Sequence, residues 1–365
     1  MTAPRRTGGT SGVALFDAVD SLLEHRAIPW VAGESAFTAS LGVVVQGPVL
    51  TGGPRTTAAT LASVRRHLPG AVLVLSTWEG QPTAGLDVDV VVRSRDPGGL
   101  LPRRPGGKPN NVNRQLVSTR AGLAELRTTH ALKLRSDSLL LNGDVVRAPA
   151  SFEDRGVAHP TRVFGERVVI TTHYTRYPAR VDREMTYHPS DVAQFGTLRD
   201  LRELWAAPLF DDAVEALLGD RMVVAEQWYW LTCLTRAGIG AALDRRDAVR
   251  HSRSALAANF IVLSPERFGL AKETLHGSDR LSCYSHSDWL RDDSLLGGGP
   301  GTMPLQWLQR WLTARLWFER RTAPWPSRDR EALPARRPGP LAPALDPERQ
   351  PPAAPVLAAY DRVAR

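Results

Sequence analysis

Cysteine is nearly absent from this chain, and so are the signatures of secretion or membrane insertion. The two cysteines among 365 residues, Cys233 and Cys283, lie far apart and outside any C-x-x-C spacing. Neither a disulfide framework nor a structural zinc site is therefore indicated. No run approaches the ~18 apolar residues of a transmembrane helix, and residues 1–9 lack the apolar core of a signal peptide. These absences predict a cytoplasmic protein and leave room for peripheral contact with the inner face of the plasma membrane.

Several common functional motifs are also missing. No G-x-G-x-x-G or G-x-x-x-x-G-K-[ST] pattern occurs, which argues against a dinucleotide dehydrogenase and against a P-loop enzyme. The absence of G-x-S-x-G leaves a hydrolase triad unsupported. Basic residues are not interleaved with aromatic ones as in an RNA-binding strand, and no zinc-finger spacing is present. We therefore expect no specific nucleic-acid partner.

What the chain does have is positive charge and enough apolar residues for a large core. The formal net charge is +8, which favours anionic partners such as nucleotides or an acidic membrane surface. Hydrophobic residues make up 42%, so the length allows one large α/β domain or two small ones.

From residue 41 onward, apolar strand patterns alternate with helical patterns, which indicates βαβ units and a parallel sheet. Ligands of open α/β sheets bind outside the carboxyl ends of the strands, so the polar residues that follow each strand are candidates for a site. The predicted strands are Leu41–Val45, Ala71–Ser76, Val88–Val92, Ala131–Leu134, Arg167–Thr172 and Phe260–Leu263, and the predicted helices are Val13–Leu23, Thr56–Leu68, Val112–Leu126, Leu198–Trp205, Val214–Leu218 and Met222–Leu234.

The segment 131–138 carries three charged residues along one strand and its end. Lys133, Arg135 and Asp137 fall on one face because side chains alternate along a strand. Two cations are costly to bury without partners, and a phosphate-bearing ligand would supply those partners. Asp137 could then hold a divalent ion, Mn²⁺ or Mg²⁺, against the phosphate. The alternative is a strand with one solvated face.

Polar residues also follow the first two strands. Gln46, Gly47 and Pro48 end the first strand, where a glycine lets the backbone approach a base or ribose, or simply makes a turn. Trp78 ends the second, where it could stack on a base or seal the sheet edge.

A cluster of polar side chains opens the helix predicted at 112–126. One asparagine would suffice as a cap, so several polar residues together suggest a pocket wall at a helix N-terminus that favours phosphate. The candidates are Asn111, Asn113, Arg114 and Gln115.

Two segments of the second half could supply a base. Glu226 has mostly apolar neighbours one helical turn away, which predicts a raised pKa and suits a general base; the alternative is a buried glutamate paired with an arginine. The loop from His188 to Asp191 could bind an acceptor, ligate metal with Asp137 or supply the base, and it could equally be a solvated turn.

These residues belong to segments that resemble, in order, the motifs of the WavE lipopolysaccharide-synthesis family, over residues 40–275. The Asn-Arg-Gln and Lys-x-Arg-Ser-Asp segments are the most specific. The matching segments are Val43–Pro48, Leu75–Gly80, Asp96–Gly99, Asn111–Thr119, Lys133–Asp137, His188–Asp191 with Phe195 and Gly196, Glu226–Tyr229, and Asn259 with Phe260.

The resemblance implies a GT-A-like, Rossmann-type nucleotide-diphospho-sugar transferase fold with a mixed, mainly parallel sheet. It implies a metal-dependent glycosyltransferase that moves a sugar from a nucleotide-sugar donor to a lipopolysaccharide-core or surface-polysaccharide acceptor, and it adds Asn259 to the substrate-binding residues. The alternatives are a sugar nucleotidyltransferase and a non-catalytic assembly protein that binds nucleotide or anionic glycan.

The expected organisation has five parts. Residues 1–36 form an N-terminal extension, 37–150 the nucleotide-sugar half, and 151–296 the acceptor-side half of the same domain. Residues 297–321 contain a helix rich in tryptophan and arginine, and 322–365 form a disordered tail rich in proline and arginine. The pattern in 303–321 fits an interfacial helix on an anionic bilayer, or equally a helix docked on this protein's own core.

Overall fold

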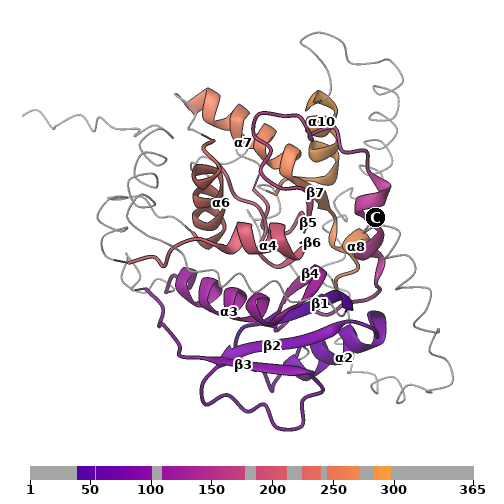
Figure 1. Cartoon of the computed structure of the whole chain (residues 1–365), viewed down its shortest axis with the longest axis vertical. Helices are drawn as coiled ribbons and strands as arrows, with labels where there is room; N and C mark the ends of the chain where they lie inside the picture. The colour runs from indigo at the N-terminus through magenta and orange to yellow at the C-terminus, as the bar shows by residue number, and fades with distance from the viewer. Residues whose placement is uncertain are drawn as a thin grey trace, which may run out of the picture.

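The computed structural model describes residues 39–53, 55–100, 109–176, 186–211, 224–239, 245–271 and 283–296, and the structural statements below concern these residues. They form a seven-stranded sheet flanked by helices (Figure 1). The elements are β1 (Ala39–Gln46), α2 (Thr57–His67), β2 (Val72–Trp78), β3 (Val90–Ser94), α3 (Val112–Glu125), β4 (Thr128–Arg135), β5 (Val168–Thr171), β6 (Ala193–Thr197), α4 (Leu198–Trp205), α6 (Ala225–Arg236), α7 (Arg245–Asn259), β7 (Phe260–Leu263), α8 (Pro265–Phe268) and α10 (His286–Leu296), with two short 3-10 helices at Asp144–Arg147 and Pro149–Ser151.

The central strands form because their apolar runs are covered on both faces. Residues 43–45 of β1 and 73–75 of β2 are completely buried, as expected for parallel strands between two helical layers. Two of the helices, α2 and α4, begin at threonine caps: the Thr56 hydroxyl accepts a hydrogen bond from the Ala59 amide, and the Thr197 hydroxyl accepts one from the Asp200 amide.

The strand order is β3-β2-β1-β4-β6-β5-β7. Strands β3, β2, β1 and β4 are parallel neighbours, and β5 pairs in parallel with β7. Between them, β6 is antiparallel to both β4 and β5. All strands except β6 therefore point the same way, and the predicted α/β class with a mixed, mainly parallel sheet is confirmed.

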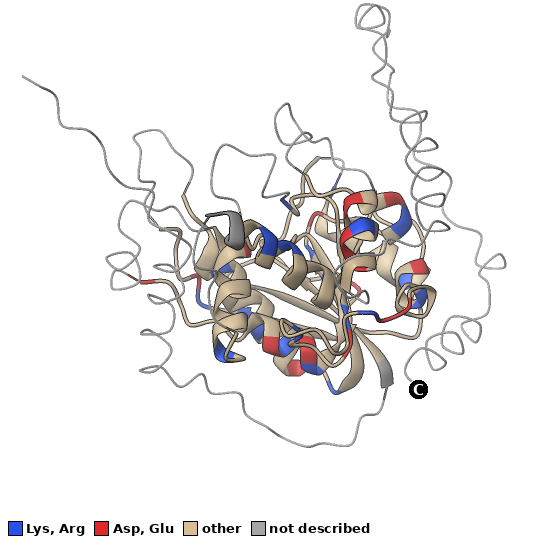
Figure 2. Ribbon diagram, turned by 90° about the horizontal axis from the view of Figure 1, so that it is seen from above, with Lys and Arg blue, Asp and Glu red and all other residues tan. Residues whose placement is uncertain are grey.

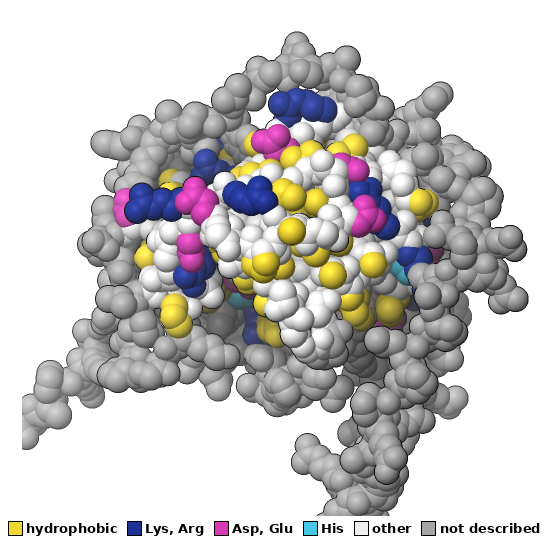
Figure 3. Space-filling view, turned by 90° about the horizontal axis from the view of Figure 1, so that it is seen from below, with side chains coloured by type: hydrophobic (Ala, Val, Ile, Leu, Met, Phe, Trp, Pro, Cys, Tyr) yellow, Lys and Arg dark blue, Asp and Glu magenta, His cyan; other side chains and the backbone are white. Residues whose placement is uncertain are grey.

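Helices cover both faces of this sheet. Figure 1 shows α3, α4 and α6 on one side and α2 and α8 on the other, with α7 and α10 near β7. Charged residues lie mostly on the surrounding helices and loops rather than on the strands (Figure 2). Seen from below, basic and acidic side chains lie next to each other (Figure 3), in keeping with ion pairs such as Arg65 with Asp89 at 2.8 Å.

Most predicted elements are present within a few residues of their expected bounds. The short strand β6, the helices α7, α8 and α10 and the two 3-10 helices were not predicted. The predicted helices Val13–Leu23 and Val214–Leu218 and the helix in 303–321 lie outside the described residues. Strands from both predicted halves pair in one sheet, since β4 lies beside β6. Among the described helices, none has the length and apolar character to cross a bilayer.

Candidate functional site

The carboxyl ends of β1, β2 and β4 lie side by side and bring many predicted residues to one edge of the sheet. Register pairs Gln46 with Ser76 on one side and with Arg135 on the other. The buried ring of Trp78 lies two residues further along β2. Because side chains alternate along parallel strands, Gln46 and Arg135 project to the same face of the sheet, the one that α3 covers. The candidate site lies at this edge of the sheet.

The turn after β1 requires glycine. Gly47 has a φ of 125°, and its amide donates to the Ser76 carbonyl at 3.0 Å. A Cβ at this position would lie 2.9 Å from the Ser136 hydroxyl oxygen. The backbone of Gly47, at the end of β1, therefore packs closely against Ser136 in the Arg135–Asp137 turn. The next residue, Pro48, is exposed.

Two of the predicted polar residues are engaged inside the protein. The Gln46 side-chain oxygen accepts from the Ser118 hydroxyl of α3 at 2.6 Å. The Asn113 amide donates to the Phe210 carbonyl at 2.6 Å and accepts from the Phe210 amide at 2.7 Å. Asn113 therefore ties α3 to the segment after α4. Gln115 is different, because its Oε1 is buried and has no partner among the described residues.

The entrance to α3 carries an ion pair at the surface. Arg114 binds Asp96 through Nε and Nη2, both at 2.8 Å, and donates to Asn111 at 3.1 Å. The helix start is held by Asn110, whose side-chain oxygen accepts from the Val112 amide at 3.1 Å. Asn111 is exposed. Arg114 and Asn111 thus face solvent near a helix N-terminus, where an anion is favoured.

Arg135 and Asp137 bind each other at the end of β4. Nε of Arg135 lies 3.0 Å from Oδ1 of Asp137, and Nη2 lies 2.7 Å from Oδ2. Both carboxylate oxygens of the predicted metal ligand therefore accept from a guanidinium. The described residues also hold no group of three histidine, cysteine or acidic side chains able to bind a metal ion. A divalent ion held by Asp137 would therefore take its other ligands from a bound diphosphate, and no step proposed below passes through the ion.

Lys133 points into the protein rather than toward the open edge. Its side chain is completely buried, and Nζ donates to the Asp191 backbone carbonyl and lies 4.0 Å from Oδ2 of the same residue. The ammonium also lies over the Trp205 ring, 5.0 Å from its centre. Burial lowers the pKa of Lys133 to about 8, although the Asp191 carboxylate acts in the opposite direction.

Asp191 and Glu226 form a carboxyl pair beside that lysine. Asp191 precedes β6 and is 3% exposed, whereas Glu226, in the first turn of α6, is half-buried. Burial raises the pKa of Glu226 to about 8, and the charge of Asp191 and a hydrogen bond between the two carboxyl groups add to this. The raised pKa predicted for Glu226 is thus found, with a second carboxylate as its neighbour. At neutral pH this favours the protonated form of Glu226.

The loop that carries Asp191 is strained and firmly held. Tyr187 has a φ of 56°, unusual for a bulky residue, and its amide donates to the Ser252 hydroxyl at 2.7 Å. Burial lowers the pKa of the next residue, His188, to about 4, with the charge of Arg176 adding to the effect. His188 Nδ1 is buried and has no hydrogen-bond partner among the described residues. His188 is therefore neutral near pH 7. Strain of this kind is typical of functional sites.

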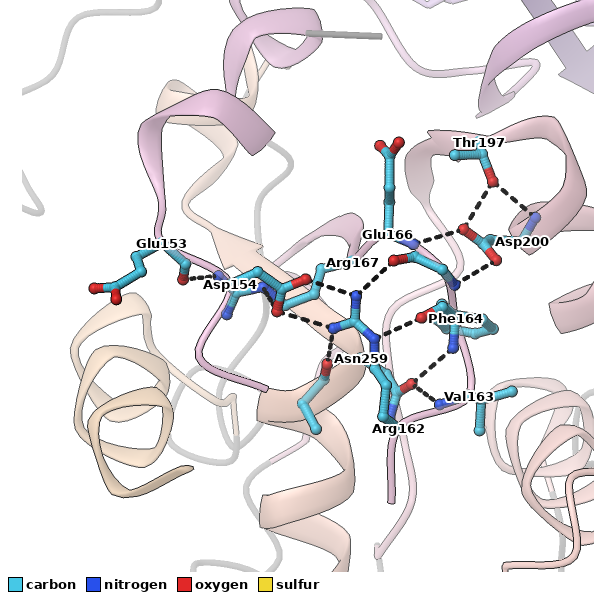
Figure 4. Close-up of polar contacts among 12 residues, drawn as sticks. Glu153, Asp154, Arg162, Val163, Phe164, Glu166, Arg167, Thr197, Asp200 and Asn259 are labelled. Atoms are coloured by element: carbon cyan, nitrogen blue, oxygen red, sulfur yellow. Dashed lines mark hydrogen bonds and ion pairs between the residues drawn. The ribbon is translucent and has the colours of Figure 1, made fainter. Parts of the chain in front are cut away.

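Asn259 does not join the other predicted residues. It ends α7 just before β7, and β7 runs parallel to β5 from its first residue, so Asn259 lies at the amino edge of the sheet. Its side-chain oxygen accepts from the Val163 and Phe164 amides at 2.7 and 3.2 Å (Figure 4). Its amide nitrogen donates to the Thr161 and Ala255 carbonyls at 2.6 and 2.9 Å. The side chain holds the loop before β5, together with Arg162, which binds Asp154 at 2.7 Å.

Sequence reasoning missed three buried residues that support the site. Gln194 of β6 donates to the Ser190 carbonyl at 2.9 Å and accepts from the Trp205 indole at 2.6 Å. Tyr229 of α6 donates to the Pro189 carbonyl at 2.8 Å. The available signal was a glutamine in a short, mostly apolar stretch, directly before the matched Phe195.

Comparison with known proteins identifies the family of this chain. The model of the WavE lipopolysaccharide synthesis family matches residues 41–299. No curated protein matches the chain. The chain is also similar to the crystal structure of 4-diphosphocytidyl-2C-methyl-D-erythritol synthase from Anaerococcus prevotii DSM 20548, at 13% identity over 51% of this chain and 87% of that one. The TM-score of 0.27 is too low to carry an argument.

Proposed function

The chain belongs to the WavE lipopolysaccharide synthesis family, and from this premise we propose that it is a glycosyltransferase. It would move a sugar from a nucleotide-sugar donor to a saccharide or lipid-linked saccharide acceptor during lipopolysaccharide-core or surface-polysaccharide assembly. The observation that carries the proposal is the buried Asp191 carboxylate, 4.0 Å from Lys133 Nζ, beside Glu226, whose pKa is raised to about 8 by burial and by the charge of Asp191. A pair of this kind is suited to taking a proton from an acceptor hydroxyl.

The donor side of the proposal uses the edge formed by β1, β2 and β4. The nucleoside would lie along the Gln46–Pro48 turn near Trp78, with the diphosphate toward Arg135 and the entrance of α3. Arg135 is 36% exposed at its side chain, so its guanidinium can be reached from outside. Its charge would stabilise the leaving nucleoside diphosphate as the sugar–phosphate bond breaks.

The acceptor side uses the carboxyl pair. A hydroxyl oxygen of the acceptor would form a bond to the anomeric carbon as the nucleoside diphosphate leaves, and its proton would pass to the pair. Glu226 is the member that solvent reaches, since it is half-buried whereas Asp191 is buried. A base in this position suits an inverting displacement.

The divalent ion and the membrane contact are further parts of the proposal. Mn²⁺ or Mg²⁺ would offset charge on the diphosphate when bound, and Asp137 would be its protein ligand after releasing Arg135. The enzyme would work on the cytoplasmic side of the plasma membrane, with the segment 303–321, which its sequence pattern predicts to be a helix, as a peripheral contact. Its basic net charge of +8 favours such an anionic surface.

Calorimetric titration with UDP, GDP, CMP and ADP, each with and without Mn²⁺, tests the donor side. We expect one nucleoside diphosphate to bind, and sugar transfer from the matching nucleotide sugar to be lost in Glu226→Gln and Asp191→Asn. Pyrophosphate release from a nucleoside triphosphate and a sugar phosphate would point to a nucleotidyltransferase instead. Nucleotide or glycan binding that is unchanged in Glu226→Gln, with no turnover, would indicate a non-catalytic assembly protein.

A further inference from the structure

Strand β3 forms one end of the sheet, and among the described residues no strand lies beside its outer edge. The Ser94 carbonyl accepts from the amide of Glu79, which follows β2, so Ser94 directs its backbone groups toward β2. In a parallel ladder such residues alternate with residues whose amide and carbonyl point the other way. Val91 and Arg93 therefore direct their backbone groups to the open edge, where they can pair with another strand.

The sequence around this edge is self-complementary in charge. Asp87 and Asp89 precede Val91 by four and two residues, and Arg93 and Arg95 follow it by two and four. These four charged residues are exposed, whereas the even-numbered valines between them pack against the core. In the view from below, where β3 is the lowest labelled strand of Figure 1, basic and acidic side chains border a surface with hydrophobic ones (Figure 3). The solvent side of the edge thus carries opposite signs at its two ends.

The charges at the two ends of β3 are not balanced within the described part of the chain. Asp87 and Asp89 share one arginine, Arg65, at 3.2 and 2.8 Å. Their side chains stay 75% and 45% exposed, and a carboxylate can accept from a second guanidinium. At the other end, Arg93 and Arg95 form no ion pair with an acidic residue of the described ranges. One end therefore has surplus negative charge and the other surplus positive charge.

We propose that the outer edge of β3 is a self-association surface, at which two copies of this chain pair their β3 strands in antiparallel fashion about a two-fold axis at Val91. The two Val91 residues form a hydrogen-bonded pair across this axis, because their amides and carbonyls point outward. The same register sets Asp89 opposite Arg93 and Asp87 opposite Arg95, each twice by symmetry. Four cross-strand ion pairs then join the two copies.

Charge selects both the direction and the register of this pairing. Parallel association of two copies would set like charges beside each other, which is unfavourable. A slip of two residues in either direction keeps only one kind of ion pair, either Asp89 with Arg95 or Asp87 with Arg93. The partner is a second copy because the sequence of this edge complements its own reverse.

The geometry also sets the strength of the dimer and the place of its two sites. A contact of one short strand buries less surface than the roughly 1,200 Å² of a stable interface, so the dimer is weak and forms at micromolar concentrations. Antiparallel pairing directs the carboxyl edges of the two sheets opposite ways. Neither copy therefore covers the candidate site of the other.

Sedimentation equilibrium of the full chain, at concentrations up to a few hundred micromolar, tests the surface. We expect a monomer–dimer equilibrium in the wild type. Val91→Pro removes an outward amide but no bond to β2, a change that edge strands tolerate, and it should abolish the dimer. Arg95→Glu sets like charges opposite each other twice and should weaken dimerisation by about tenfold. Arg95→Glu carries the test if Val91→Pro does not fold.

A matched control makes the same change in net charge elsewhere. Arg147→Glu alters an exposed pair with Asp144 outside β3, and its dimerisation should equal that of the wild type. Mixing two variants then tests the register. Asp87→Arg and Arg95→Glu each repel themselves, but in a one-to-one mixture every substituted side chain faces an opposite charge, so dimers should return to the wild-type level.

Three results would overturn the proposed surface. The first is a wild-type chain that stays monomeric over the whole concentration range. The second is a dimer that persists unchanged in folded Val91→Pro or in Arg95→Glu, which would place the contact elsewhere. The third is a mixture of Asp87→Arg and Arg95→Glu that forms no more dimer than either variant alone.

Discussion

Arg135 and Asp137 hold each other through two hydrogen bonds, of 3.0 and 2.7 Å, at the carboxyl end of the central strand β4. Their sequence positions predict two separate tasks, a diphosphate contact for the arginine and a metal contact for the aspartate. Without a ligand, each neutralises the other, which removes the cost of an uncompensated charge at the sheet edge. A bound diphosphate and cation would have to replace this pair.

We expect Asp137→Asn to abolish or severely reduce sugar transfer, by roughly 100-fold or more, while the fold stays intact. The amide would lose the charge that orients Arg135 and would be a poor ligand for Mn²⁺. Transfer rates and Mn²⁺-dependent nucleotide binding measure the two effects separately. Asp144→Asn is the control, because Asp144 forms an exposed pair with Arg147 outside the site. Full activity in Asp137→Asn would remove Asp137 from the mechanism.

Glu226 makes the stability of the protein depend on pH. The pKa of Glu226 is raised from 4.5 to about 8 in the folded state. Between these two pH values the folded protein keeps a proton on Glu226 that the unfolded chain has released. The stabilisation is complete below pH 4.5 and is lost as pH rises through about 8, a change of roughly 2–5 kcal/mol.

Urea unfolding across this pH range should therefore show a falling free energy of unfolding for the wild type and a flatter curve for Glu226→Gln. Glu203→Gln, which alters a more exposed carboxylate paired with Arg236, should keep the wild-type slope. Equal slopes for the wild type and Glu226→Gln would contradict a proton on Glu226.

Asn259→Ala should destabilise the protein by about 2–4 kcal/mol. The substitution removes three hydrogen bonds that join the end of α7 to the loop before β5, and a fourth to the Ala255 carbonyl within α7. Since Asn259 lies at the amino edge of the sheet, nucleotide affinity of the folded variant should not change. Asn142→Ala, which removes one side-chain contact to the Asp144 amide, is the stability control. A selective loss of nucleotide binding would restore the substrate-binding role that the family resemblance implies.

Gly47→Ala should cost about 1–3 kcal/mol of stability. The residue has a φ of 125°, and an added Cβ would lie 2.9 Å from the Ser136 hydroxyl. Gly52→Ala is a matched control in the same loop, because an added Cβ there would meet open space. Thermal unfolding of both variants measures the difference, and equal midpoints would show that the turn relaxes without strain.

The strands β1, β2 and β4 and the helices between them follow from local sequence patterns. A run such as residues 43–45 must be buried on both faces, and helices such as α4 begin at a threonine cap. Since parallel strands end at one edge, the sequence also places Gln46, Trp78 and Arg135 in one neighbourhood. The apolar neighbours of Glu226 on the helix predict a raised pKa, and Asp191, from a distant segment, raises it further.

Local sequence patterns did not determine strand β6, the buried partner of Lys133 or the position of Asn259; these depend on the tertiary structure. The antiparallel strand β6 has five residues, including a glycine and a glutamine, and it forms because β4 and β5 offer hydrogen bonds on both sides. It brings Asp191 to the end of β4, where Lys133 has a buried partner. The direction of β7 places Asn259 at the opposite edge. Local sequence fixes which face of a strand a residue occupies, but pairing between distant strands determines which partners complete its charge and hydrogen bonds.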